Sequence, residues 1–503
     1  MIYNEPAYKK ICVTVKKYRL TKMGSAGLTV ADITAKSALP LQKVKELLPV
    51  AADEYSAHLQ VTESGEIIYI FPKIWRSKYT SLKARFSRFA DKLIEGVKVV
   101  GMTVFKFWIM IMLIGYFVFF LLLALAALLL SVAAQSKSNS SDNRGNSAGG
   151  GFFLVSNLFD MIIRIWFYSE LTKSTQTYRY NNYNNYNSQA QKPKGKPLHK
   201  AIFSFVFGDG NPNANQEERQ KQAVIAYIQA NKGVISLPEF MLLTGFEPLQ
   251  AENKITEYCV QYGGSPEVSC GGTVVYKFDD LLLRPAKKGN AAERSLLGTS
   301  AALKNLRTFS GNKSNMNTAF CFINGINLLF GSYFLFFLFN GVSANSGGAF
   351  LFIMSAHIFA SLGITNLVPV MFFGLGLVPI VFSLLFWLIP AIRLARINKE
   401  NEEIKFENLR KYSITYIYNN PLDVQSENLK VNMKECTPLN LKQAQDKIIN
   451  EIGGYYKADV TVTDDGKTSY IIKELENEKT AVENYRATLN TKSSDLGSVV
   501  FEA

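Results

Sequence analysis

The sequence contains few of the residues from which disulfide frameworks and metal centres are built. Its 503 residues include five cysteines, and no two of them form a C-x-x-C pair. An odd number of scattered cysteines argues against a disulfide framework and against a zinc or iron–sulfur site formed by this chain alone. We therefore expect free thiols in a reducing compartment, with no metal ion and no cofactor.

Catalytic signatures are also missing. The chain has no G-x-x-x-x-G-K-[ST] phosphate loop, no G-x-S-x-G nucleophile turn and no H-E-x-x-H zinc-binding helix. Its three histidines, His58, His199 and His357, are far apart in the sequence. Because these patterns carry much of the chemistry of hydrolases and nucleotide enzymes, we expect that the protein is not an enzyme.

Long apolar runs, in contrast, are present. A helix needs about 20 apolar residues to cross a bilayer, and residues 101–134, 317–341 and 366–395 meet this requirement. Residues 152–171 are barely long enough, and we predict a short span or an interfacial amphipathic helix there. Residues 349–364 are too short to cross and are predicted to be re-entrant or interfacial. The sequence therefore predicts an integral membrane protein with about four spans.

Ionisable residues within these segments are functional candidates by default. Asp160 and Arg164 are four residues apart, so they can pair on one face of a helix. His357 lies in the short segment, next to a span that contains several glycines. A small polar pathway at these residues would make the protein a transporter or channel, which is the third of the functions we consider.

The net charge of +14 is concentrated next to the apolar runs. A basic juxtamembrane helix is predicted over residues 73–100 and a basic linker over 286–316, where both can contact anionic lipid. The positive-inside rule then places the termini and the soluble modules in the cytosol, at the cytoplasmic membrane. The first ten residues are polar, so no cleaved signal peptide is expected.

One short pattern, V-[ST]-x-x-G-x-x-x-Y-x-[FI], occurs three times outside the apolar runs. Each copy predicts a two-stranded hairpin whose turn uses the glycine and whose tyrosine packs on neighbouring helices. The copies are VTESGEIIYIF, VSCGGTVVYKF and VTDDGKTSYII, with glycines Gly65, Gly272 and Gly466 and tyrosines Tyr69, Tyr276 and Tyr470. The repetition indicates that one fold unit occurs three times.

A Pro-Leu pair precedes each hairpin and is predicted to open a helix, from Pro40, Pro248 and Pro438. Shorter helical segments come before this helix in the first two copies. Three helices followed by a hairpin is the plan of winged-helix domains, which these segments resemble. The predicted modules are 1–72, 200–285 and 397–490, the last with a helical tail, and a low-complexity linker covers 172–199.

Winged-helix domains often bind DNA through the outer face of a basic helix. The three Pro-Leu helices carry balanced charges, or an acidic excess in the second copy, and contain no arginine. Because phosphate neutralisation supplies most nonspecific affinity for DNA, nucleic acid is a disfavoured partner. Protein docking fits these surfaces better, and the third module with its tail at 474–489 is the preferred docking candidate.

A longer stretch carries a more specific resemblance. The segment AIFSFVFGDGNPNANQEERQKQAVIAYIQANKGVIS, residues 201–236, resembles a membrane-protein family of cyanobacteria and plant chloroplasts that has an F-S-F-V-F-G-D-G-x-P-N motif. Some plant members are labelled as iron–sulfur cluster biosynthesis proteins, but no cysteine here has ligand spacing. The resemblance implies the architecture and a membrane location, and it implies no established activity.

The FGDGNPN loop also invites a comparison with calcium-binding loops. Asp209, Asn211 and Asn213 occupy the first ligand positions of an EF-hand, but Ala214 stands where glycine is required and Gln220 where glutamate should chelate. We therefore predict a turn followed by a capped helix.

These observations lead to one preferred hypothesis. The fold class is multi-domain, with an α-helical membrane part of about four spans and three α+β winged-helix-like cytosolic modules. The expected function is that of a membrane scaffold or adaptor that docks protein partners, and a homo-oligomer is possible. A membrane-tethered nucleic-acid-binding regulator is the second hypothesis.

Overall fold

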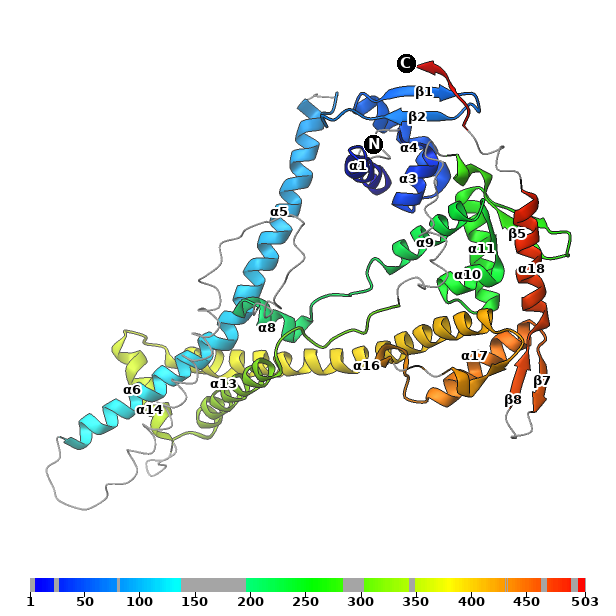
Figure 1. The fold of residues 1–503 in the computed structure, drawn as a ribbon. Helices are drawn as coiled ribbons and strands as arrows, with labels where there is room; N and C mark the ends of the chain where they lie inside the picture. The colour runs from blue at the N-terminus through cyan, green and yellow to red at the C-terminus, as the bar shows by residue number, and fades with distance from the viewer. Residues whose placement is uncertain are drawn as a thin grey trace, which may run out of the picture. The chain divides into compact units, whose positions relative to one another are not determined.

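A computed structural model describes most of the chain, and Figure 1 shows its fold. It divides into two compact units, which we call the module unit (Met1–Arg88, Asn211–Arg307 and Lys399–Ala503) and the membrane unit (Phe89–Gly210 and Thr308–Asn398). The residues described are 5–21, 27–78, 82–136, 196–283, 303–342, 349–429, 431, 433–462, 468–489 and 496–502.

Within the described residues, three helices are long and apolar enough to cross a membrane. The first continues through α5 (Leu82–Met110), a π-helical turn η2 (Ile111–Gly115) and α6 (Tyr116–Ser136). The second is α13 (Ser314–Asn340), and the third combines α15 (Leu367–Pro369), η6 (Val370–Leu377) and α16 (Val378–Asn419). These helices cover the predicted spans at 101–134, 317–341 and 366–395. The segment 152–171 lies outside the described residues.

Two shorter apolar helices complete the described part of the membrane unit. Helix α14 (Phe350–Ser361) has 12 residues and α8 (Leu198–Phe207) has 10. At about 1.5 Å per residue, neither is long enough to cross a bilayer. We expected a module from residue 200 onward, but α8 groups with the membrane helices, so the second module begins after it.

Polar and close-packed contacts hold the long apolar helices together. The side-chain amide of Asn327 donates to the carbonyl of Leu113 at 2.8 Å, within the π-helical turn. A side-chain carbon added at Gly331 would lie 3.2 Å from the carbonyl oxygen of Gly376, so the two backbones approach closely. Because lipid tails are as apolar as the side chains, such contacts supply much of the specificity between helices in a bilayer.

The module unit consists of three parts that each contain helices and a hairpin (Figure 1). The first module contains α1 (Pro6–Tyr18), α3 (Val30–Ser37), α4 (Leu41–Glu54), β1 (His58–Thr62) and β2 (Ile67–Ile70). The second contains α9 (Gln216–Ala230), β3 (Val234–Ser236), α10 (Leu237–Thr244), α11 (Pro248–Tyr262), β4 (Ser265–Val268), β5 (Val274–Lys277) and η3 (Asp279–Leu282).

The third module begins within α16, a helix that continues without a break from Val378 to Asn419. Its other elements are β6 (Val424–Gln425), η7 (Ser426–Asn428), η8 (Lys434–Cys436), α17 (Leu441–Tyr455), β7 (Asp459–Val462), β8 (Thr468–Ile471), α18 (Lys473–Thr488) and β9 (Val499–Glu502). The predicted helix start at Pro438 is wrong, since α17 begins at Leu441.

Local capping explains where the short helices begin and end. The hydroxyl of Thr29 accepts from the N–H of Asp32, and the Asp32 carboxylate accepts from the N–H of Thr29 in return. Ser236 and Glu239 form the same reciprocal pair at the start of α10. Such pairs satisfy N–H groups that a helix leaves without partners at its first turn. Gly245 ends α10 in the left-handed conformation, with φ of 78°.

The three modules share one hydrophobic core. A single cluster of buried side chains includes Leu47 from α4, Phe240 from α10 and Ile448 from α17, each almost inaccessible to solvent. Helix α11 packs against both α4 and α17. The three modules therefore form one compact body, whereas we had expected separate docking surfaces.

Candidate functional site

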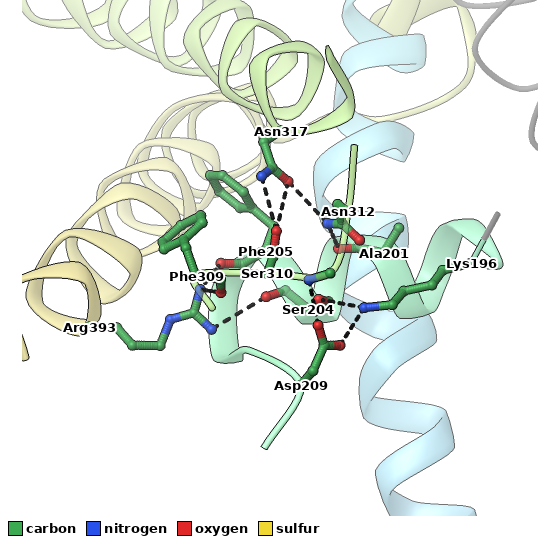
Figure 2. A network of polar contacts seen from close by, with 11 residues as sticks. Lys196, Ala201, Ser204, Phe205, Asp209, Phe309, Ser310, Asn312, Asn317 and Arg393 are labelled. Atoms are coloured by element: carbon green, nitrogen blue, oxygen red, sulfur yellow. Dashed lines mark hydrogen bonds and ion pairs between the residues drawn. The ribbon is translucent and has the colours of Figure 1, made fainter. Parts of the chain in front are cut away.

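The FGDG loop forms a network of polar contacts that we call the clasp, made by Lys196, α8, Asp209, residues 309–317 and Arg393 (Figure 2). The Arg393 guanidinium donates to the carbonyls of Phe205 and Phe309, at 2.8 Å each, and stacks over the Phe309 ring. The Asn312 amide donates to the carbonyl of Ala201 at 2.7 Å. The bond to Phe205 satisfies a carbonyl that the last turn of α8 leaves without a helical partner.

Asp209 anchors the other side of the clasp. Its carboxylate accepts from the Lys196 ammonium at 2.6 Å (Figure 2) and from the N–H of Gly311 at 2.6 Å. Partial burial by itself would raise the pKa of Asp209, but these hydrogen bonds outweigh it and lower the pKa. Asp209 is therefore ionised at neutral pH, which suits a structural ion pair and not a proton donor.

Side-chain oxygens of the loop accept hydrogen bonds from N–H donors of the chain. The side chain of Asn211 accepts from the N–H of Asn213 at 3.0 Å, and that of Asn213 accepts from the N–H of Asn305 at 2.9 Å. Asn215 stands at the N-cap of α9, as an Asn was predicted to do, but its side chain makes no capping hydrogen bond. The motif that carried the resemblance thus serves as a structural turn in this chain.

The repeated pattern forms an antiparallel hairpin in each module. Gly65 and Gly272 have φ of 80° and 77°, a conformation that glycine adopts without strain. Tyr69 is buried in the shared core, whereas Tyr276 and Tyr470 pack against it while partly exposed. Gly466 lies outside the described residues.

Each hairpin gains a third strand, but not on the same side. The strand orders are β3-β5-β4 in the second module and β6-β8-β7 in the third, so β4 and β7 are outer strands. In the first module the order is β2-β1-β9, and the corresponding strand β1 is covered by the C-terminal strand β9 (Figure 1). The first strand of the hairpin is therefore covered by another strand in the first module, whereas it is the outer strand of the sheet in the second and third modules.

Specific contacts hold β9 against β1, and we call this binding surface on β1 the seat of β9. Val61 of β1 lies opposite Phe501, the Gln60 amide donates to the Glu502 carboxylate at 3.0 Å, and the N–H of Glu63 donates to the carbonyl of Ser498 at 3.0 Å. Leu496, just before the strand, is only 5% exposed. Main-chain pairing with one buried apolar anchor is the usual arrangement when an extended segment is added to a sheet.

The Pro-Leu helices are engaged in contacts between modules. The Tyr455 hydroxyl next to the end of α17 donates to Glu252 of α11 at 2.5 Å, and Lys45 of α4 pairs with Asp280 of the second module at 2.8 Å. Tyr262 of α11 donates to the carbonyl of Ala38 at 3.3 Å. Part of the surface of each of these helices is therefore covered by another module.

The helical tail α18 is docked on the second module, a contact that the sequence did not signal. The Arg486 guanidinium forms two hydrogen bonds to the Glu239 carboxylate, at 2.7 Å each, and a third to the carbonyl of Val234 at 2.8 Å. Val482 of α18 is buried against Val234 and Val275. The tail was the preferred docking candidate, but this face of it is occupied within the chain.

Of the predicted membrane-embedded polar residues, His357 lies within the described part of the chain. His357 is on α14 with an exposed side chain, and it lies outside the three long apolar helices. Asp160 and Arg164 lie outside the described residues. Among the described residues, buried polar side chains between the long helices include Asn324 and Asn327 on α13 and Ser383 on α16, which the ionisable-residue criterion passed over.

Three apolar helices and a body with small sheets fit a multi-pass membrane protein. The chain is similar to an uncharacterised chloroplastic protein of Arabidopsis thaliana, with 22% identity over 280 residues. The similar region covers 54% of this chain and 50% of the plant protein, so the chain spans about half the length of this relative. No protein-family profile matches the chain, and no solved structure matches it.

Proposed function

We propose that the protein is a membrane-anchored scaffold that binds extended segments of partner proteins at the edges of its hairpins. The occupied edge of β1 is the observation that carries this proposal, because the chain itself shows how a strand is held there. In the proposed architecture the three modules are winged-helix-like and face the cytosol, as the basic residues beside the spans favour.

The outer strands β4 and β7 have the properties that strand addition requires. Val460 and Val462 on β7 are 59% and 71% exposed, and Val268 on β4 is 68% exposed. An edge strand presents unpaired backbone groups, and exposed β-branched side chains add apolar contact for an incoming strand. Partners with short extended segments rich in valine and aromatic residues, like β9 itself, would fit these edges.

Packing of the Pro-Leu helices supports a scaffold over a nucleic-acid-binding regulator. A winged helix reads DNA by placing its recognition helix in the major groove. Here α11 lies against α4 and α17 and bonds to both neighbouring modules. A groove-binding pose for α11 would require separation of the shared core.

The test uses the seat of β9 with the full membrane-inserted protein. Removing residues 496–503 uncovers β1, and a fluorescent peptide with the sequence LGSVVFEA is then added in solution. We expect saturable binding to the shortened protein and much weaker binding to the intact chain, whose seat is filled. In the shortened protein, Glu63→Pro should abolish binding because it removes the N–H that donates to Ser498, whereas Glu63→Ala keeps that N–H. Equal binding of a scrambled peptide would contradict the proposal.

A further inference from the structure

A polar cavity in the module unit is separate from the hairpin edges. Its volume is about 100 Å³, compared with roughly 10–15 Å³ for a site that holds one water. It lies between the start of α9, the α10–α11 turn and the last turns of α16. The side chains that define its chemistry are Gln220, Thr244, Lys304, Glu407, Arg410 and Lys411.

The charges around this cavity are unbalanced. Lys304 forms an ion pair with Glu407, so the one carboxylate in the lining is already engaged. Arg410 has a guanidinium nitrogen 3.5 Å from Glu451 and 3.9 Å from Glu247, two carboxylates that are not part of the lining. Lys411 has no such partner: among the described residues, no carboxylate pairs with its ammonium group. The lining therefore carries an excess of positive charge.

Lys411 is unusual because it is also buried. Its side chain is only 6% exposed, and its stem packs against Gly245 at the turn after α10. Burial, followed by repulsion from Lys304, lowers its pKa to about 8. The Nε–H of the neighbouring Arg410 is a buried donor with no hydrogen-bond partner in the described part of the chain. Buried donors are normally satisfied, and unsatisfied ones call for an explanation such as a bound ion.

We propose that this cavity binds a compact oxyanion of the phosphate class, held by the Lys411 ammonium and the Arg410 Nε–H. Both donors come from consecutive residues of α16, and the cavity that they line has room for a compact tetrahedral group that accepts hydrogen bonds from each. The excess positive charge suits an anion with one or two negative charges. Free phosphate and the phosphomonoester headgroup of a lipid share this chemistry.

The experiment measures thermal unfolding of the full-length protein in phosphatidylcholine nanodiscs while inorganic phosphate replaces chloride at constant ionic strength. We expect a saturable rise of the unfolding temperature with phosphate. Lys411→Met should weaken the response at least about tenfold, as loss of a charged hydrogen bond does. Lys442→Met, at an exposed position on α17, should respond like the unchanged protein.

Further arms separate the sources and guard against misfolding. A response to phosphatidic acid in the nanodiscs that phosphate does not reproduce would assign the site to a lipid headgroup, and a response to phosphate would assign it to a small anion. Lys411→Gln provides a second variant that keeps the polar stem. The proposal would be overturned if the unchanged protein showed no saturable rise of the unfolding temperature with either phosphate or phosphatidic acid. It would also be overturned if both Lys411 variants kept the full rise.

Discussion

Replacing Arg486 by methionine should release the tail helix α18 from the second module. Arg486 makes two hydrogen bonds to Glu239, whose side chain is 3% exposed, and one to the carbonyl of Val234. Removing one partner of a buried ion pair costs about 3–5 kcal/mol, because the other charge stays buried without compensation. Glu239 keeps its hydrogen bonds from Tyr227 and from the N–H of Ser236, so we expect the lower value, about 3 kcal/mol.

Hydrogen exchange by mass spectrometry is the appropriate assay, since it reports local opening in a protein too large for two-state unfolding. A loss of about 3 kcal/mol should reduce the protection of the α18 amides roughly 100-fold. The matched control is Lys473→Met, also on α18. It removes an exposed ion pair with Asp459 of β7 and should leave the protection of the α18 amides unchanged.

A double variant tests the reasoning itself. In Glu239→Gln with Arg486→Met the stranded charge is gone, so the loss should be no larger than for Arg486→Met alone. Strictly additive losses, or unchanged α18 exchange in the single variant, would refute the view that a buried ion pair holds the tail.

Three further predictions concern other parts of the chain. Because the pKa of Lys411 is about 8 in the folded state and near 10.5 when unfolded, stability without phosphate should rise by about 3 kcal/mol as the pH increases through this window; thermal unfolding should show this rise, and Lys411→Met should remove it. Glu478 behaves oppositely: burial, with repulsion from Glu474, raises its pKa to about 7, so stability should fall between about pH 4.5 and 7, and Glu478→Gln should flatten the same pH series. Asn327→Leu leaves the Leu113 carbonyl without its donor inside the bilayer and should lower the unfolding temperature, at a cost of about 1 kcal/mol. Asn340→Leu, at an exposed helix end, is its control.

Specific results would contradict each of these. A pH series that is the same for the unchanged protein and Lys411→Met would mean that the amine is not perturbed by burial. No effect of Glu478→Gln would place that carboxyl in contact with water. Equal unfolding temperatures for Asn327→Leu and Asn340→Leu would show that the Leu113 carbonyl finds another donor.

Local sequence determined the elements of this protein. Apolar runs of sufficient length specify the long helices, because a bilayer requires about 20 apolar residues whatever the rest of the chain does. Glycine at a turn between β-branched and aromatic residues specifies a hairpin, because few residues adopt positive φ. The capping pair at Thr29 and Asp32 is likewise written in neighbouring positions. Each of these signals depends on residues a few positions apart.

Only the tertiary structure decided how the elements are used. Val61 pairs with Phe501, and Arg486 meets Glu239, across hundreds of residues in sequence, and no local periodicity reports such contacts. Lys411 lies in a helix of mixed charge and gives no sign of burial until the turn at Gly245 covers its stem. The FGDG motif predicts a turn, but its sequence gives no sign that Lys196 and the N–H of Gly311 bind its carboxylate. Burial and pairing depend on what the rest of the chain places nearby, so these properties belong to the fold and not to the segment.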